Sequence, residues 1–85
     1  MATPVPITVY TREECPLCDE AVETIERVAA DEDVPVDVDL VDVDADAALR
    51  EEYGDRVPYV LVDGTPRFKF RVDGRDLRRL LADAQ

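Results

Sequence analysis

The ten residues VYTREECPLC, Val9–Cys18, decide how the rest of the sequence is interpreted. They overlap Ile7–Tyr10, a β-branched and aromatic segment that is typical of a β-strand. The polar residues Thr11–Glu14 follow and predict a loop. The motif Cys15–Cys18, which reads CPLC, then opens a helix, because Pro16 suits the first helical turn, where its missing N–H costs nothing. The stretch therefore predicts a strand, a loop and a helix with two cysteines at its N-terminal end.

The residues after the CPLC motif have the pattern of an amphipathic helix. Apolar side chains recur there at three- and four-residue spacing; they are Ala21, Val22, Ile25, Val28 and Ala29. Asp19 and Glu20 place negative charge near the start of this helix, which the helix macrodipole favours. The acidic run Asp31–Asp33 predicts that the helix ends there in a solvated loop.

A second strand and a short helix are expected next. Apolar and acidic residues alternate from Val34 to Val43, and Pro35 with the acidic face favours a strand at a sheet edge. The apolar side of this strand consists of Val36, Val38 and Leu40. Asp44 is the expected N-cap of a helix from Ala45 to Tyr53, which Gly54 closes.

The last part of the chain predicts a hairpin and a final helix. Tyr59–Val62 reads as a third strand, and Asp63-Gly64 is a strong signal for a hairpin turn. In the fourth strand, apolar residues alternate with basic ones; the two sets are Phe68, Phe70 and Val72, and Arg67, Lys69 and Arg71. Asp73 caps the final helix. The apolar face of that helix carries Leu77, Leu80, Leu81 and Ala84.

The expected element order is therefore β-α-β-α-β-β-α, in a single domain that spans residues 1–85. A helical crossover makes the first two strands parallel, whereas the tight turn makes the last two antiparallel. The predicted fold class is α/β with a four-stranded mixed sheet.

The charge balance is strongly acidic. The chain has 21 Asp and Glu against 10 Lys and Arg, which gives a net charge of −11, and Lys69 is its only lysine. Such a field repels nucleic acid phosphates and anionic lipid headgroups, so neither nucleic acid nor a membrane is an expected partner. Excess acid with so little lysine is typical of proteins adapted to high salt, which is the interpretation we favour. The N-terminal residues lack the pattern of a secretion signal, so we expect a cytoplasmic protein. We also expect it to be a monomer.

Two cysteines and no histidine narrow the chemistry. Without histidine there is no Cys–His catalytic pair and no Cys₂His₂ zinc site, and we predict no metal ligands. At the N-terminal end of a helix, Cys15 gains from unpaired N–H groups and the helix dipole as a thiolate, so its pKa should fall below the free value of about 8.5. Cys18, one turn along, is close enough to resolve a mixed disulfide on Cys15. The rival interpretations are an inert buried pair and half of a metal site.

These segments resemble glutaredoxins. The run Val9–Cys18 is similar to the start of that family, with a strand, a basic residue three positions before the first cysteine, and C-P-x-C. Val57-Pro58-Tyr59-Val60 resembles the family's cis-proline segment before the third strand. The resemblance covers Ile7 to about Leu81 and is nearest to short glutaredoxin-like proteins with a CPLC motif. It implies a thioredoxin fold and a dithiol–disulfide oxidoreductase.

The resemblance also implies roles for individual residues. Cys15 matches the nucleophile and Cys18 the resolving cysteine. Pro58 matches the cis-proline beside the active-site pair, and Val57 the residue whose backbone pairs with the substrate. Arg12 is a candidate partner for the thiolate or for a substrate carboxylate.

The glutathione site of the family is only partly present. Of the Gly-Gly-[Cys/Ser]-Asp pattern that holds the γ-glutamyl end of glutathione, this chain keeps Gly74 and Asp76. We therefore expect no bound cofactor, with glutathione or an analogue as a low-molecular-weight thiol co-substrate. The expected partners are protein or small-molecule disulfides and a reductase or thiol reductant. The alternative is a non-catalytic binding module in which Cys15 holds an iron–sulfur cluster or a metal, although Pro16 and the second cysteine favour redox chemistry.

Overall fold

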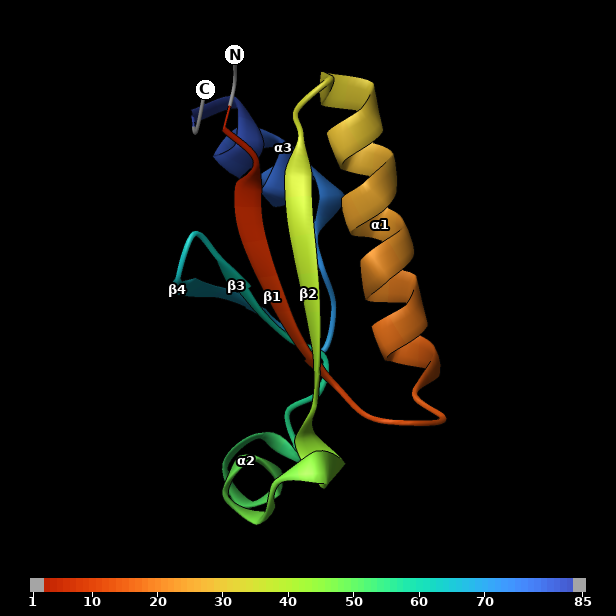
Figure 1. Cartoon of the computed structure of the whole chain (residues 1–85). Coiled ribbons are helices and arrows are strands. Elements are labelled where there is room, and N and C mark those ends of the chain that lie inside the picture. The colour runs from red at the N-terminus through yellow and green to blue at the C-terminus, as the bar shows by residue number, and fades with distance from the viewer. Residues whose placement is uncertain (1–2, 84–85) are drawn as a thin grey trace.

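The computed structural model of the chain describes residues 3–83, so Ala84 of the last expected helix lies outside the described residues. The elements follow the expected order, with a short 3₁₀ turn, η1, added before the second helix (Figure 1). They are β1 (Val5–Thr11), α1 (Pro16–Glu32), β2 (Val36–Asp42), η1 (Val43–Ala45), α2 (Ala47–Tyr53), β3 (Tyr59–Val62), β4 (Thr65–Lys69) and α3 (Gly74–Asp83).

The four strands form one mixed sheet in the order β2-β1-β3-β4. β1 pairs in parallel with β2, whereas β1 with β3 and β3 with β4 are antiparallel. The expected mixed sheet and the edge position of the acidic second strand are therefore confirmed. Asp63 and Gly64 both have positive φ, of 53° and 81°, as the tightest two-residue hairpin turns require.

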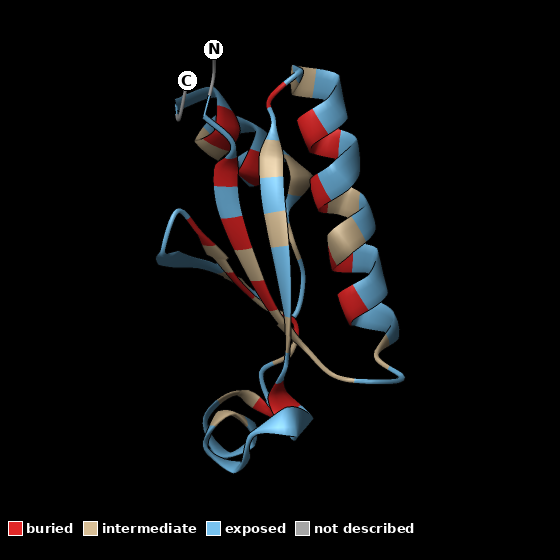
Figure 2. Cartoon of the chain, viewed as in Figure 1, coloured by how far each residue is buried: buried red, intermediate tan, exposed pale blue. Residues whose placement is uncertain are grey.

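The core lies between one face of the sheet and the helices α1 and α3. β1 and β3 present alternate residues to this layer, as expected from the two-residue period of a strand. The buried residues of the cluster are Val5, Ile7, Val9, Ile25, Val28, Ala29, Val34, Val60, Val62, Leu77 and Leu81. Figure 2 shows the same arrangement, with buried residues along β1 and on the side of α1 that faces the sheet. The apolar spacing that predicted the first and last helices is thus the spacing that fills the core.

The helix α2 is placed differently from α1 and α3. None of its described residues, 47–53, is buried, and it lies beyond the end of the sheet (Figures 1 and 2). The expectation that Asp44 caps this helix is wrong. Asp46 is the N-cap, and its Oδ1 accepts hydrogen bonds from the N–H groups of Ala48 and Leu49 at 2.8 and 3.3 Å. The 3₁₀ turn η1 occupies Val43–Ala45, so α2 begins only at Ala47.

The second strand is shorter than expected, and its apolar face is incomplete. Val34 lies in the loop that closes α1, where its N–H donates to the carbonyl of Ala29. Val36 and Val38 are half-buried, but Leu40 is 55% exposed. β2 is an edge strand with a neighbour on one side only, so an apolar residue near its end lacks half of the partners that a central strand provides.

The fourth strand ends earlier than the alternation indicated. β4 stops at Lys69, and the expectation that it continues to Val72 is wrong. Phe70 has a φ of 72° and donates its N–H to the carbonyl of Pro58 at 2.8 Å, outside the strand ladder. Positive φ is uncommon for a bulky residue. Phe70 is 43% exposed, so the predicted apolar face of this strand is broken at this residue.

Leucine truncation tests this assignment of core and surface. Leu77 is fully buried and Leu40 largely exposed, so the same chemical change should have very different costs. We expect Leu77→Ala to lower the free energy of unfolding by about 2–5 kcal/mol. Leu40→Ala should change it by less than about 0.5 kcal/mol. Urea unfolding followed by circular dichroism measures both, and equal losses would contradict the placement of α3.

The acidic edge of the sheet generates a prediction about salt. Asp37 and Asp39 are exposed on β2, next to further carboxylates in a chain of net charge −11. Salt shortens the screening length from about 10 Å at 0.1 M to about 3 Å at 1 M, which relieves their repulsion. The melting temperature should therefore rise between 0.1 and 1 M KCl, and rise less in Asp37→Asn/Asp39→Asn. A flat or falling melting temperature in the wild type would refute salt adaptation.

Candidate functional site

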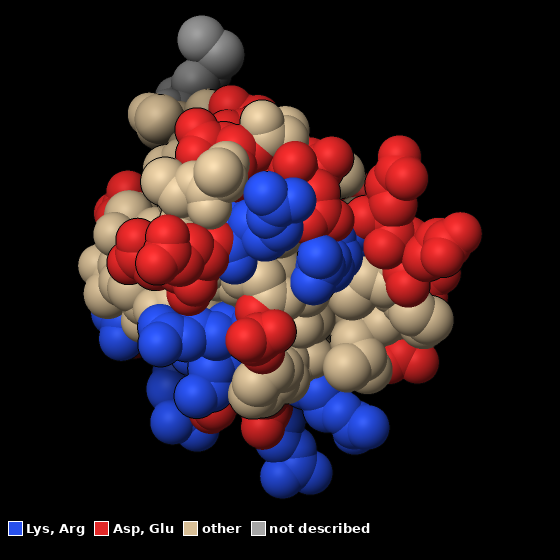
Figure 3. All heavy atoms as spheres, turned by 90° about the horizontal axis from the view of Figure 1, so that it is seen from below, with Lys and Arg blue, Asp and Glu red and all other residues tan. Residues whose placement is uncertain are grey.

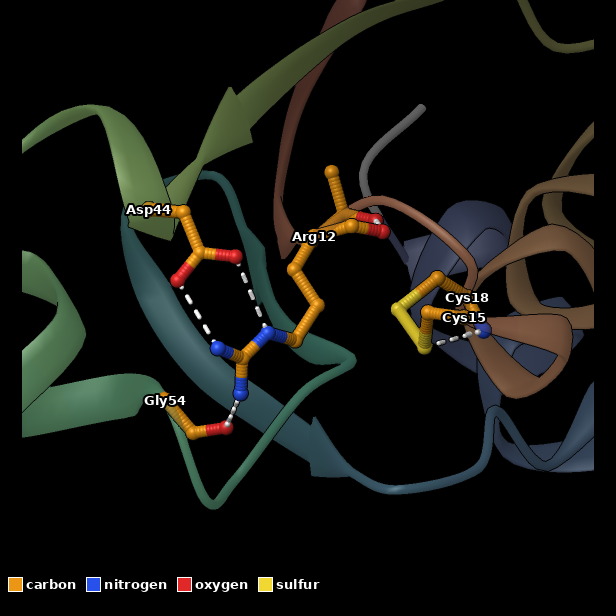
Figure 4. The surroundings of a disulfide bond; sticks show 6 residues. Arg12, Cys15, Cys18, Asp44 and Gly54 are labelled. Carbon is orange, nitrogen blue, oxygen red and sulfur yellow. Dashed lines mark hydrogen bonds and ion pairs between the residues drawn. A yellow bond between two sulfur atoms is a disulfide. The ribbon is translucent and has the colours of Figure 1, made fainter.

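The two cysteines lie where the chain passes from β1 into α1, and they are joined by a disulfide bond (Figure 4). Cys15 is the N-cap of α1, with the extended backbone typical of that position, and Pro16 is the first helical residue. The Sγ of Cys15 accepts a hydrogen bond from the N–H of Cys18 at 3.2 Å. A sulfur atom thus takes the place of the serine or aspartate oxygen that usually caps a helix.

The two sulfurs differ in access to solvent. Cys15 is half-buried, whereas Cys18 is 2% exposed and packs with the buried side of α1. This difference agrees with the expected order, in which Cys15 meets the substrate and Cys18 lies behind it. In the reduced protein, the N–H of Cys18 and the positive end of the helix dipole would stabilise a thiolate at Cys15.

Arg12 is held on the side of the loop away from the disulfide. Its Nε and Nη2 donate to the two carboxylate oxygens of Asp44 at 3.1 and 2.8 Å, and its Nη1 donates to the carbonyl of Gly54 at 3.0 Å. Figure 4 shows the guanidinium pointing toward these partners and not toward Cys15. The bidentate pair ties the end of β1 to η1 and to the end of α2. A role for Arg12 in binding a substrate carboxylate stays a prediction.

Val57 and Pro58 lie at the same end of the sheet as the disulfide. The peptide bond between them is cis, as the sequence led us to expect. Pro58 is fully buried and Val57 half-buried. The next residue, Tyr59, pairs with Tyr10 of β1, just before the loop that carries the cysteines.

Gly74 and Asp76 lie in the first turn of α3. Asp73 caps this turn as expected, because its Oδ1 accepts from the N–H groups of Arg75 and Asp76 at 2.9 and 3.3 Å. Gly74 lies against α1, where an added Cβ would be 3.7 Å from a methyl carbon of Val28. The structure therefore places Gly74 beside α1, whereas Asp76 lines a separate hollow with Arg67 and Phe68 of β4. The role of these two residues in binding glutathione stays a prediction.

One hollow beside the CPLC motif was not found from the sequence. It has a volume of about 180 Å³ and lies between the first turns of α1 and the segment after β4. Its lining residues are Leu17, Glu20, Ala21, Thr24, Arg71 and Val72. Because the alternation predicted a strand through Arg71, the sequence did not indicate that Arg71 lies near Leu17 of the CPLC motif.

Three tyrosines form an aromatic cluster at the α2 end of the sheet. The rings of Tyr10 and Tyr53 are stacked with centroids 4.3 Å apart, and Tyr59 lies 5.1 Å from Tyr53. Burial raises the pKa of Tyr53, and the charge of Glu52 adds to the effect. Tyr53 is therefore protonated at neutral pH, and the cluster serves to attach α2.

Among residues 3–83, no three His, Cys, Asp or Glu side chains are grouped so that they could hold a metal ion. Within the same residues, no helix combines the length and the apolar character needed to cross a membrane.

Comparison with known proteins agrees with this architecture. The profile of the family described as "Glutaredoxin-like domain (DUF836)" matches residues 6–82. The uncharacterized protein Rv0508 of Mycobacterium tuberculosis is 30% identical over 79 residues, which make up 89% of this chain and 81% of that protein.

Two solved structures extend the comparison. The structural genomics target XcR50 of X. campestris is 34% identical, with a TM-score of 0.74 over 93% of this chain and 99% of its own. Thioredoxin-2 of the malaria parasite is 17% identical, with a TM-score of 0.62 over 98% of this chain and 85% of its own. The expected thioredoxin fold is therefore confirmed.

Alkylation tests the difference between the two cysteines. After reduction, we expect brief treatment with iodoacetamide to label Cys15 before Cys18, since Cys15 is more exposed and is the helix N-cap. The rate should rise through a pKa below the free value of about 8.5. Peptide mass mapping after quenching measures the order, and Cys15→Ser gives the rate of Cys18 alone. Preferential labelling of Cys18 in the wild type would reverse the assignment.

Proposed function

The chain belongs to the glutaredoxin-like domain family (DUF836), and from that premise we propose that it is a dithiol–disulfide oxidoreductase. Its substrates are protein disulfides or mixed disulfides with small thiols. The observation that carries the proposal is the placement of the Cys15–Cys18 pair, with the half-buried sulfur at the helix N-cap and the buried one directly behind it.

The reductive half of the cycle begins with the dithiol. The Cys15 thiolate attacks one sulfur of the substrate disulfide, so that a bond forms between Cys15 and that sulfur while the substrate S–S bond breaks. The other substrate sulfur leaves as a thiolate and takes up a proton. Cys18 then loses its proton and attacks the Sγ of Cys15, which expels the remaining substrate thiolate. Two electrons pass to the substrate, and the Cys15–Cys18 disulfide is the product.

The cycle closes when a reductant supplies two electrons. Two molecules of a low-molecular-weight thiol, or the dithiol of a reductase, reduce Cys15–Cys18 and become a disulfide themselves. Glutathione or an analogue is the proposed small thiol. Such a reductant is maintained in the cytoplasm, which is the compartment that we propose for this activity.

Substrate contacts are proposed at the same end of the sheet. The main chain of Val57, held by the cis bond to Pro58, would pair with the backbone of a substrate as an added strand segment. Three of the five N–H groups of Arg12 donate to Asp44 and Gly54, so two remain as donors to a substrate carboxylate.

Serine variants separate the two cysteine roles. Cys15→Ser should abolish reduction of a peptide mixed disulfide, because no nucleophile remains at the exposed position. Cys18→Ser should accumulate a covalent protein–substrate mixed disulfide, since nothing resolves it from within. Intact mass spectrometry and a turnover assay with excess thiol measure both outcomes.

Two controls accompany this experiment: the folded state of each variant and the visible absorbance of the purified protein. Circular dichroism should show that both variants remain folded. Residual turnover by Cys15→Ser would refute the mechanism. A coloured, cluster-loaded protein after purification would favour the binding-module alternative, since a dithiol does not absorb visible light.

A further inference from the structure

The basic residues of this acidic protein are gathered in one segment. Residues 67–79 contain six of the ten Lys and Arg and two acidic residues, a net charge of +4. The remaining residues contain four basic and nineteen acidic side chains, a net charge of −15. In the view from the α2 end, Figure 3 shows Lys and Arg in the middle and lower parts of the face, with some Asp and Glu between them and more over the upper part and the right-hand side.

Part of this basic segment leads to the hollow next to the CPLC motif, which Arg71 lines. We call Lys69, Phe70 and Arg71 the basic rim. All three residues are exposed. The ammonium of Lys69 lies 5.4 Å from the centroid of the Phe70 ring, within cation–π range. Phe70 is fixed against the active-site end of the sheet, because its N–H donates to the carbonyl of Pro58 at 2.8 Å.

The basic rim is continuous with the CPLC motif. Arg71 shares the 180 Å³ hollow with Leu17, the residue between Pro16 and Cys18. Leu17 is 37% exposed and Phe70 is 43% exposed, so two large apolar side chains flank the basic groups. Aromatic side chains and arginine, here Phe70 and Arg71, are residue types enriched at protein interfaces.

Acidic residues also lie close to the cysteines. Glu13 and Glu14 are exposed in the loop before Cys15, and Asp19 and Glu20 are exposed in the first turns of α1. Glu20 lines the same hollow as Leu17 and Arg71. Charges of both signs therefore lie near the CPLC motif, so a partner that approaches Cys15 meets attraction or repulsion according to which of them it contacts.

The backbone conformation of Phe70 also supports a binding role for the basic rim. A bulky residue with a φ of 72° has an unfavourable conformation, and such residues cluster at binding sites and switches. In this chain the conformation turns the ring out of the strand, so that it is exposed beside Lys69 and Arg71. A residue that only filled the core would be more stable in the strand that the sequence pattern predicts.

We propose that the basic rim docks the acidic segment of a protein partner whose cysteine reacts with Cys15. The inference rests on the proposed function and adds its substrate class: protein disulfides flanked by Asp or Glu. Leu17 and Phe70 supply the apolar contact, and Lys69 and Arg71 select the charge.

The net charge of the chain argues for the opposite preference, but the screening length limits its range. At 0.1 M salt, exposed charges act over about 10 Å, so carboxylates farther than that from the disulfide are screened there. Glu13, Glu14, Asp19 and Glu20 are not that far along the chain, so the preference depends on whether the partner contacts these residues or the basic rim. Charges at the edge of an interface mainly change the association rate and its salt dependence.

Two charge-reversal variants with the same net charge test the proposal. Lys69→Glu/Arg71→Glu changes the basic rim, and Arg27→Glu/Arg50→Glu changes two exposed helical arginines that make no ion pair in the described part of the chain. Each variant lowers the net charge of −11 by four. The probes are three synthetic peptide disulfides of equal length, with Asp, Lys or only neutral residues on both sides of the cysteine.

The measured quantity is kcat/KM for each peptide at 0.1 M and 1 M KCl. The wild type should prefer the acidic to the basic peptide by about tenfold at 0.1 M, which is the lower range of electrostatic steering. Lys69→Glu/Arg71→Glu should lose or reverse that preference, whereas Arg27→Glu/Arg50→Glu should keep it. At 1 M KCl the preference should shrink in both proteins that show it.

Other outcomes overturn the docking proposal and leave the activity standing. Equal effects of the two variants would mean that net charge alone sets the preference, and a wild-type preference for the basic peptide would exclude the rim as an acidic-segment site. Failure of the proposed function is distinguishable, because the neutral peptide would then not be reduced by any of the three proteins.

Discussion

The hydrogen bond from the N–H of Cys18 to the sulfur of Cys15 is the constraint on which the rest of the structure depends. It helps to make Cys15 the N-cap, so that α1 begins directly at the cysteine pair. On the helix that follows, Cys18, Ile25 and Val28 lie on the buried side. Cys15, at the end of the helix, stays half-buried. One helix therefore both fills the core and gives the two sulfurs different access to solvent.

The other side of the site is held by longer-range contacts. α2 has no buried residue among positions 47–53, so its own apolar face does not attach it. The Arg12 pair with Asp44 and Gly54 and the tyrosine stack do so instead. An exposed ion pair contributes about 0–1 kcal/mol, and each aromatic pair about 0.5–1.5 kcal/mol beyond its buried area. The stack is thus the stronger attachment, and the ion pair mainly fixes the direction of the loop before Cys15.

Local patterns in the sequence predicted the elements that are stabilised locally. The spacing of apolar residues predicted both core helices, and Asp63-Gly64 predicted the hairpin. Helix faces and turn conformations depend on residues that are close together in the sequence; here the helix positions are Ile25, Val28, Leu77 and Leu81. The cis bond at Pro58 came from the family resemblance. The departures at Leu40, Asp44 and Phe70 depend on partners far along the chain: an edge without a second neighbour, the guanidinium of Arg12, and the carbonyl of Pro58. Alternation in the sequence does not contain that information.

The contrast between total and local charge follows from the range of electrostatic forces. A net charge of −11 acts on a distant partner, and its effect weakens as salt shortens the screening length toward about 3 Å at 1 M. Contacts at van der Waals distance are much less screened, and the apolar area of Leu17 and Phe70 does not depend on charge. At high salt, selection among acidic partners must therefore come from side chains that touch them. A rim that combines a ring, an ammonium and a guanidinium near Leu17 retains its apolar contact, and a reduced charge preference, under conditions where the field of the whole molecule no longer discriminates.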